Sequence, residues 1–341
     1  MRFGLFGGAT ARHGAVSDSQ LYGEFVDYVC EAEELGFKSV FLVEHHFTGM
    51  SQVSSSLSML AYLAARTTTI RLGTAVVVLP WHNPALLAEQ AATIDLLSNG
   101  RFDFGIGKGY RYNEFSGFCI PMEEAGERYQ ETLDFLRKAW TSGGRFSHHG
   151  RRWHFENVVI EPPPVQQPHP PLWVAAGSPD VIRDVGAQGF NLLLDQFGSP
   201  EVTGQRIAAY RDGVERGGGI YRGERVGLTR ALCLAHTARE REEVIAARAK
   251  FLLGAHALAA NPHVKSSLAL PTTPEELRQA TEANALIGPP REIVERLERL
   301  QQAGVEYVLL LDVLGSREAL RTFAREVIPA FAEETPRVAA Q

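Results

Sequence analysis

The chain has 341 residues, of which 45% are hydrophobic and 22% are charged. Its 34 basic and 40 acidic residues give a net charge of −6, which argues against general binding to nucleic acid or to an anionic membrane surface, because both require a basic footprint. No apolar stretch approaches the ~20 residues of a membrane span, and the first apolar run is too short for a secretory signal. The cysteines Cys30, Cys119 and Cys233 have neither zinc-ligand spacing nor a disulfide pattern, so we expect a reducing, cytoplasmic setting.

Short apolar runs alternate with helical patterns along the chain, and the runs are continuous, as in strands buried on both faces of a parallel sheet. In chain order, the predicted strands are Arg2–Gly7, Ser39–Val43, Ile70–Leu79, Phe102–Ile106, Leu172–Ala176, Asn191–Leu194, Gly227–Ala235 and Tyr307–Leu311. The predicted helices are Gln20–Leu35, Ser54–Ala65, Pro84–Leu97, Gly126–Trp140, Pro179–Gln188, Thr203–Arg216, Arg239–Leu253, Pro290–Ala303 and Ser316–Phe331. Eight β/α units favour a closed (β/α)8 TIM barrel, so we expect residues 1–341 to form one α/β domain.

Two stretches interrupt this alternation. Residues 143–171 are rich in proline and form an excursion before the fifth strand, with room for a hairpin. Residues 255–288 separate the last two helical patterns before the final strand, and their first part is polar and rich in turn-forming residues. Because long loops in compact domains are usually functional or mobile, we expect this second stretch to be a lid.

The active site of a barrel enzyme lies at the C-terminal ends of its strands, and the second predicted strand is followed by Glu44, His45, His46 and Phe47. The two histidines could bind a metal, take part in proton transfer or hydrogen bonding, or be structural. A metal is the least favoured reading, because zinc requires three or four convergent ligands and neighbouring residues of an extended segment point in opposite directions. Proton transfer or hydrogen bonding is the most favoured.

Two further segments at strand ends carry weak signals for an anion. Gly105–Gly109, with Lys108, permits close backbone approach and supplies a cation, but it lacks the Walker spacing and equally fits a turn with a solvated lysine. Gly177 and Ser178 precede a predicted helix, where exposed amides favour an anion. Ser178 before Pro179 is also what helix capping alone would select.

Several of these segments, in this order and spacing, resemble the bacterial luciferase-like family of flavin-dependent monooxygenases. The matching segments are Leu42–Thr48, Leu72–Pro80, Leu97–Phe102, Gly105–Gly109 and, more faintly, Gly288–Glu292. The resemblance implies a barrel that binds reduced FMN at its C-terminal mouth. It also implies that the flavin reacts with O2 to give a C4a-hydroperoxide and that one oxygen atom passes to a small organic substrate. A separate NAD(P)H:flavin reductase would supply the reduced flavin.

The resemblance also assigns roles to individual residues. His45 matches the catalytic histidine beside the reactive edge of the flavin, with Glu44 and His46 supporting it. Ala75 and Val76 match a pair that is joined by a cis peptide bond and packs on the flavin ring. The phosphate-binding positions correspond to Lys108, Gly109, Arg128, Gly177 and Ser178, and no metal site is implied.

Other interpretations stay open at this point. A deazaflavin-dependent oxidoreductase of the same superfamily would transfer hydride, a non-catalytic flavin-binding partner subunit would bind without reacting, and a metal hydrolase is the most distant alternative. Phe47, Trp81, Tyr110 and Tyr112 are candidates for lining an apolar substrate pocket, although each could equally serve packing. The resemblance further predicts a homodimer through Ser54–Ala65 and Pro84–Leu97, and the sequence does not name the substrate.

Overall fold

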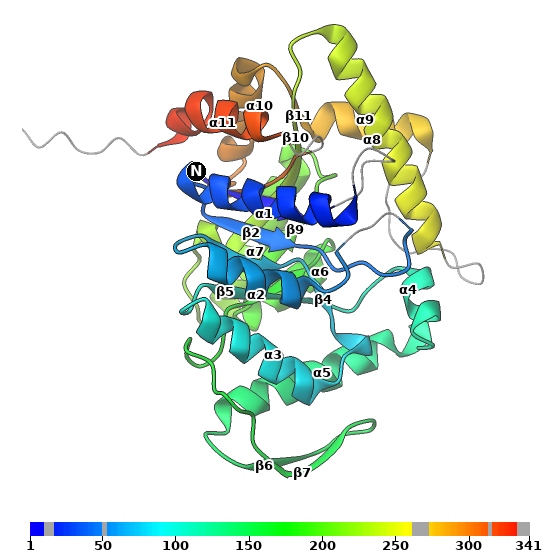
Figure 1. Ribbon diagram of the computed structural model, residues 1–341, viewed down its shortest axis with the longest axis vertical. Helices are drawn as coiled ribbons and strands as arrows, with labels where there is room; N and C mark the ends of the chain where they lie inside the picture. Colours follow the sequence, from blue (N-terminus) through cyan, green and yellow to red (C-terminus); the bar gives the residue numbers. More distant parts are fainter. Residues whose placement is uncertain (10–16, 50–52, 261–272, 313–315, 333–341) are drawn as a thin grey trace, which may run out of the picture.

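Eight parallel strands close into a barrel that follows the order of the chain (Figure 1). The computed structural model describes residues 1–9, 17–49, 53–260, 273–312 and 316–332. The barrel strands are β1 (Arg2–Gly7), β2 (Ser39–Leu42), β3 (Arg71–Thr74), β5 (Phe102–Gly107), β8 (Leu172–Ala175), β9 (Asn191–Leu194), β10 (Val226–Leu234) and β12 (Tyr307–Asp312). The barrel closes because β12 pairs with both β10 and β1, and β9 pairs with β10. The predicted (β/α)8 barrel is therefore confirmed.

Helices surround the barrel, and the strands of the barrel separate two apolar layers. The helices are α1 (Asp18–Glu34), α2 (Ser56–Arg66), α3 (Pro84–Leu97), α4 (Tyr112–Gly117), α5 (Ala125–Thr141), α6 (Pro179–Ala187), α7 (Pro200–Arg216), α8 (Ala238–Ala259), α9 (Pro274–Asn284), α10 (Pro290–Gln302) and α11 (Arg317–Glu326). One layer packs between the strands and the helices. The other fills the barrel itself with Phe41, Trp173, Leu193, Tyr307 and Leu309. No helix in the described part of the chain is long and apolar enough to cross a membrane.

The structure differs from the predicted elements at several places. The run Ile70–Leu79 is not one strand: it divides into β3 and the short β4 (Val77–Val78), interrupted at Ala75 and Val76, whose peptide bond is cis. The expected final helix ends at Glu326 and is followed by a short 3-10 turn. The stretch 255–288 contains α9 and the short strand β11 (Leu286–Gly288), neither of which was predicted, while residues 261–272 lie outside the described residues.

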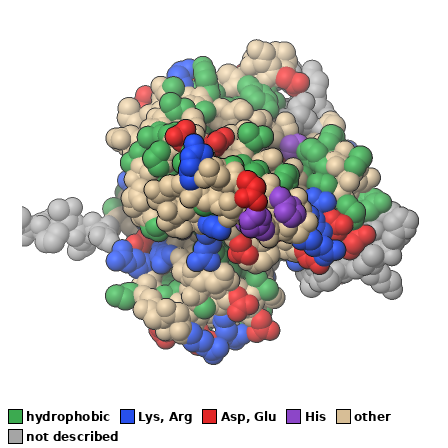
Figure 2. Space-filling model, turned by 90° about the horizontal axis from the view of Figure 1, so that it is seen from below, with side chains coloured by type: hydrophobic (Ala, Val, Ile, Leu, Met, Phe, Trp, Pro, Cys, Tyr) green, Lys and Arg blue, Asp and Glu red, His purple; other side chains and the backbone are tan. Residues whose placement is uncertain are grey.

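The proline-rich excursion carries the hairpin for which it had room. Strands β6 (Phe146–His149) and β7 (His154–Val158) pair antiparallel. The Glu131 side chain of α5 holds the hairpin turn by accepting hydrogen bonds from the backbone amides of Arg152 and Trp153, both at 2.9 Å. Viewed from the hairpin end, the surface presents acidic, basic and histidine side chains close together (Figure 2). Polar contacts to Glu131 thus help to hold the hairpin to α5, beside the packing of Phe146 and Phe155 on Phe135.

Residues on both sides of α3 have clear local roles in starting and ending the helix. Asn83 caps the start of α3 by accepting hydrogen bonds from the amides of Ala85 and Leu86. At the other end, Asn99 and Gly100 turn the chain with φ values of 53° and 78°. Glycine and asparagine tolerate this left-handed conformation best. The turn delivers the chain directly into β5.

Arg101 then joins the ends of three elements. Its guanidinium donates to the backbone oxygens of Ser98 at 2.8 Å, Ile70 at 2.8 Å, Ala64 at 3.1 Å and Thr67 at 3.0 Å, and to the Thr67 hydroxyl at 2.9 Å. Only a planar guanidinium has donors enough for this arrangement. The Leu97–Phe102 motif is therefore explained here by packing and hydrogen bonding.

We expect Arg101→Lys to lower the free energy of unfolding by about 1–2 kcal/mol, because one ammonium group cannot serve these acceptors. Urea denaturation measures the change. Arg183→Lys, at a half-exposed surface ion pair, is the control and should change stability by less than about 0.5 kcal/mol. Equal effects of the two substitutions would contradict this role of Arg101.

Candidate active site

The C-terminal ends of adjacent barrel strands bring most of the predicted site residues to one mouth. Glu44 and His45 follow β2, Ala75 and Val76 follow β3, and Lys108 follows β5. Gly177 and Ser178 come just after β8, which pairs with β5. Because parallel strands all end at the same side of a barrel, these residues share one rim.

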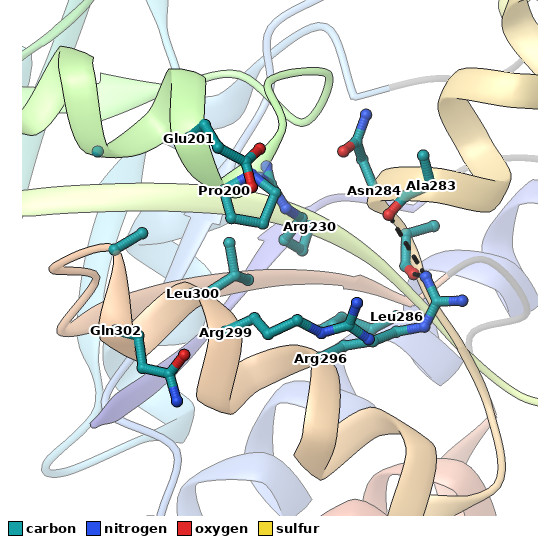
Figure 3. A pocket seen from close by; sticks show the side chains of 13 residues that line it. Pro200, Glu201, Arg230, Ala283, Asn284, Leu286, Arg296, Arg299, Leu300 and Gln302 are labelled. Atoms are coloured by element: carbon teal, nitrogen blue, oxygen red, sulfur yellow. Dashed lines mark hydrogen bonds between the residues drawn. The ribbon is translucent and has the colours of Figure 1, made fainter.

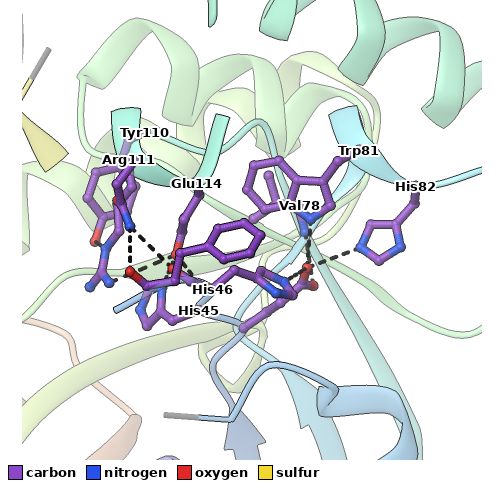
Figure 4. A network of polar contacts seen from close by, with 11 residues as sticks. His45, His46, Val78, Trp81, His82, Tyr110, Arg111 and Glu114 are labelled. Carbon is purple, nitrogen blue, oxygen red and sulfur yellow. Dashed lines mark hydrogen bonds and ion pairs between the residues drawn. The ribbon is translucent and has the colours of Figure 1, made fainter. Parts of the chain in front are cut away.

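Glu44 is a buried anchor for the loops of this mouth. Its carboxylate accepts hydrogen bonds from His46 Nε2 at 2.9 Å, Trp81 Nε1 at 2.8 Å, His82 Nε2 at 3.1 Å and the Val78 amide at 3.3 Å (Figure 4). Burial alone would raise its pKa, but the hydrogen bonds from His46, His82 and Trp81 outweigh burial and hold the pKa at about 2. Glu44 is therefore ionised, and it fixes the end of β2 to the segment beyond β3.

His45 points away from this anchor to a second carboxylate, as expected for neighbouring residues in extended backbone. Its Nδ1 lies 3.1 Å from Oε1 of Glu114, and the same oxygen accepts a hydrogen bond from the His46 amide at 3.0 Å. Because a carboxylate only accepts, Nδ1 of His45 carries the proton and Nε2 is left as a hydrogen-bond acceptor. Burial lowers the pKa of His45, so the ring is neutral at pH 7.

Glu114 was missed by the sequence analysis, as was its neighbour Arg111. Both lie at α4, and both side chains are almost completely buried. Nη1 of Arg111 is 3.9 Å from Oε1 of Glu114, while its Nε donates to the Tyr110 hydroxyl at 3.4 Å. The guanidinium thus supplies a positive charge beside the carboxylate that holds His45. No sequence signal for this contact existed, because 69 positions separate His45 from Glu114.

Ala75 and Val76 form an apolar floor that is suited to a flat ring. Both are partly buried and pack on the aromatic and leucine side chains that fill the barrel. The cis bond between them has the geometry that the resemblance implied. Gly107 fits closely beside them, since a Cβ there would come within 2.5 Å of Val76 Cγ2. An apolar floor next to a neutral histidine is compatible with an isoalloxazine ring.

The predicted phosphate-binding residues differ in how accessible they are to a ligand. Lys108, Gly177 and Ser178 are exposed, and Ser178 begins α6 without using its hydroxyl as a cap. Gly109 has φ 76°, a conformation that glycine adopts readily, and it packs near Phe115. Arg128 lies in the first turns of α5, where its Nε donates to Glu124 at 2.9 Å. Lys108 and the turn at Gly177 are thus open to a ligand, while Arg128 already has an acidic partner.

Aromatic side chains border the mouth on the side of His46. The Trp81 ring stacks on Phe118, and both the His46 and Phe47 rings contact Phe118 edge to face. Phe47 and Tyr110 remain largely exposed. A mouth bordered by aromatic rings is suited to a small organic substrate.

A separate cavity of about 470 Å³ lies between α7 and α10 (Figure 3). Its wall includes the side chains of Arg230, Arg296 and Arg299. Arg230 alternates with residues of β10 that face the barrel interior, so it points outward to the helix layer. This cavity is therefore distinct from the mouth that contains His45.

The chain is similar to known proteins in sequence and in fold. Residues 1–307 match the family described as luciferase-like monooxygenase. The oxygenase component of flavin-dependent trigonelline monooxygenase from Acinetobacter baylyi is 29% identical over 98% of this chain and 96% of its own length. FMNH2-dependent dimethylsulfone monooxygenase from Pseudomonas putida is 29% identical over 89% of this chain and 86% of its own length. The crystal structure of monooxygenase RslO1 from Streptomyces bottropensis superposes with a TM-score of 0.84 at 25% identity, covering 97% of this chain and all of that one. Other relatives are F420-dependent oxidoreductases.

Proposed function

The chain belongs to the luciferase-like monooxygenase family, and we propose that it is the oxygenase of a two-component system that uses reduced FMN and O2 to oxygenate a small organic substrate. The observation that carries this proposal is the pairing of neutral His45 with buried Glu114, on the same rim as the half-buried Ala75–Val76 floor. The similarity to an oxygenase component and to an FMNH2-dependent monooxygenase supports the choice of cofactor and the need for a reductase.

In this proposal each part of the mouth has one task. Ala75 and Val76 lie under the flavin ring, and Lys108, Gly109, Gly177 and Ser178 bind its phosphate, with Arg128 as a further candidate. Reduced FMN supplies the electrons that activate O2 when it is bound. His45 accepts a hydrogen bond or a proton at Nε2, while Glu114 holds the proton at Nδ1. The aromatic side chains around Trp81 and Phe118 limit the access of water to the reacting atoms.

We also propose a homodimer and a cytoplasmic location. Exposed apolar side chains occur on both helices of the expected interface, with exposed fractions of 53% for Tyr62 on α2, and 58% and 59% for Leu86 and Leu97 on α3. Large exposed apolar side chains on neighbouring helices are typical of a protein–protein contact. Helices α2 and α3 also contact each other, which supports a shared interface.

The proposed function is tested by mixing the purified protein with reduced FMN under anaerobic conditions and then with O2. We expect the protein to bind reduced FMN and to slow the return of oxidised-flavin absorbance compared with free flavin. Reoxidation at the rate of free flavin, together with no affinity for FMN, would contradict the proposal. Reduction of deazaflavin F420 in the presence of an alcohol or sugar phosphate would instead support the hydride-transfer alternative that the F420-dependent relatives suggest.

A further inference from the structure

The turn after β8 and the loop after β9 meet at an arginine that no motif pointed to. Arg206 lies on α7, and its Nη1 donates to Asp195 Oδ2 at 2.9 Å. Asp195 follows β9 directly, and Gly177 follows β8, the neighbouring strand. Arg206 Nη2 lies 3.6 Å, and Asp195 Oδ2 3.9 Å, from the point where a Cβ would sit on Gly177. The guanidinium therefore stands beside the bare backbone of the Gly177 turn.

Contacts to Asp195 and to the loop after β9 fix the position of the Arg206 guanidinium. Asp195 Oδ1 accepts a hydrogen bond from the Phe197 amide at 2.8 Å. Buried Arg230, visible at the back of the cavity in Figure 3, donates to the backbone oxygen of Asp195 at 3.3 Å and to that of Gly198 at 2.6 Å. Two sets of contacts thus hold the loop that orients Arg206. A pre-positioned arginine loses little side-chain entropy when it binds a ligand.

One edge of the Arg206 guanidinium is still available. In the described part of the chain, Nη1 binds Asp195 and Nη2 makes no hydrogen bond. A guanidinium has five donors and can serve two acceptors on different edges, so the pair with Asp195 orients the group without using it up. The hydroxyl of Ser178, the residue after Gly177, makes no capping bond. Exposed Gly177, Ser178 and the free edge of Arg206 therefore form one polar rim.

We infer that Arg206 binds the terminal phosphate of the flavin cofactor and is the guanidinium of that subsite. The inference rests on the proposed function, because it takes FMN as the cofactor. The missing side chain at Gly177 lets the phosphate approach the guanidinium. The negative charge of Asp195 repels the phosphate in part. Binding therefore depends on the edge of Arg206 that is not paired with Asp195.

The test compares the affinities for FMN and for riboflavin, which differ only in the phosphate. Flavin fluorescence gives both dissociation constants for the full-length protein and for Arg206→Gln. We expect the substitution to weaken FMN binding by about 10- to 100-fold, the effect of losing a hydrogen bond to a charged group. Riboflavin binding should change less than about twofold, since it makes no phosphate contact.

Two further variants complete the design. Arg241→Gln removes the same charge from an arginine that also pairs with a carboxylate, Glu292, and should leave both affinities unchanged. Arg206→Lys keeps the charge without the planar fork and should recover part of the FMN affinity, even if the glutamine variant is poorly folded.

The possible outcomes separate the two proposals. Equal loss of FMN and riboflavin affinity in both Arg206 variants would show a structural role and overturn the inference, as would unchanged FMN binding. Wild-type protein that binds FMN no better than riboflavin would exclude a phosphate subsite, while flavin binding as such would survive. Wild-type protein that binds neither would overturn the proposed function and this inference together.

Discussion

His45→Ala is expected to lower the rate of substrate oxygenation by about 10²- to 10⁴-fold, the usual contribution of a positioned acid–base group. His45 is the neutral imidazole at the mouth, and only Nε2 is free to accept a proton or a hydrogen bond. Alanine removes this acceptor without adding a charge. Flavin binding should change little, because the Ala75–Val76 floor and the phosphate-binding residues are untouched. Product formation per reduced flavin consumed measures the effect directly.

Glu114→Gln separates the positioning of His45 from its chemistry. Burial lowers the pKa of His45, while the hydrogen bond to Glu114 and its charge raise it in part, and nearby Arg111 lowers it again. In the proposed function the active form is the neutral ring, so we expect activity to fall as the pH drops through the pKa of His45. Removing the negative charge makes the imidazolium less stable, and the acid limb of the rate profile should move to lower pH.

The same variant also distinguishes positioning from a structural effect. A purely structural role of Glu114 would lower the rate at every pH and leave the acid limb in place. Retention of the wild-type oxygenation rate in His45→Ala would contradict the catalytic role of His45 itself. Nitrogen chemical shifts of the His45 ring give an independent check, because the structure requires the proton on Nδ1.

The sequence was sufficient for the barrel because each buried strand is a local signal. The apolar runs and the helical patterns between them are repeated eight times, and topology rules leave few ways to connect them. The same reasoning misread Ile70–Leu79 as one strand, because nothing in that apolar run shows the break at Ala75 and Val76. Helix α9 had an overlooked signal: Thr273 and Glu276 form a capping box with Pro274 at the first helical position.

The site was predictable only where a motif lies at a strand end. Glu44 and His45 come just after the end of β2, so the barrel rule located them. Glu114 and Arg206 lie within helices, and each contacts a partner outside its own helix: Glu114 is 69 positions from His45, and Arg206 is 11 positions from Asp195. Pair contacts of this kind leave no periodic pattern in one sequence. For Glu44 the sequence indicated a supporting role but not the four donors that surround its carboxylate.

Those four donors lead to the largest stability effect that we expect. Glu44 has a pKa of about 2 in the folded protein against an ordinary value of 4.5. A depressed pKa means that the ionised carboxylate stabilises the folded state, and the difference corresponds to roughly 3 kcal/mol. This stabilisation is fully present above the ordinary pKa and is lost as the pH falls toward the folded value. Glu44→Gln should therefore lower the free energy of unfolding by roughly 3 kcal/mol at about pH 7.

The pH dependence makes this prediction specific to the carboxylate. Glutamine does not titrate. The difference in free energy of unfolding between wild type and Glu44→Gln should therefore narrow steadily below about pH 4.5, where only the wild type loses stabilisation. Urea denaturation at about pH 7 and at about pH 3.5 measures this difference at each pH. Glu298→Gln, at an exposed position of α10, controls for the loss of one negative charge and should change stability by less than about 0.5 kcal/mol. If Glu44→Gln were destabilising by the same amount at both pH values, the cause would be packing, and the charge of Glu44 would not be what anchors the mouth.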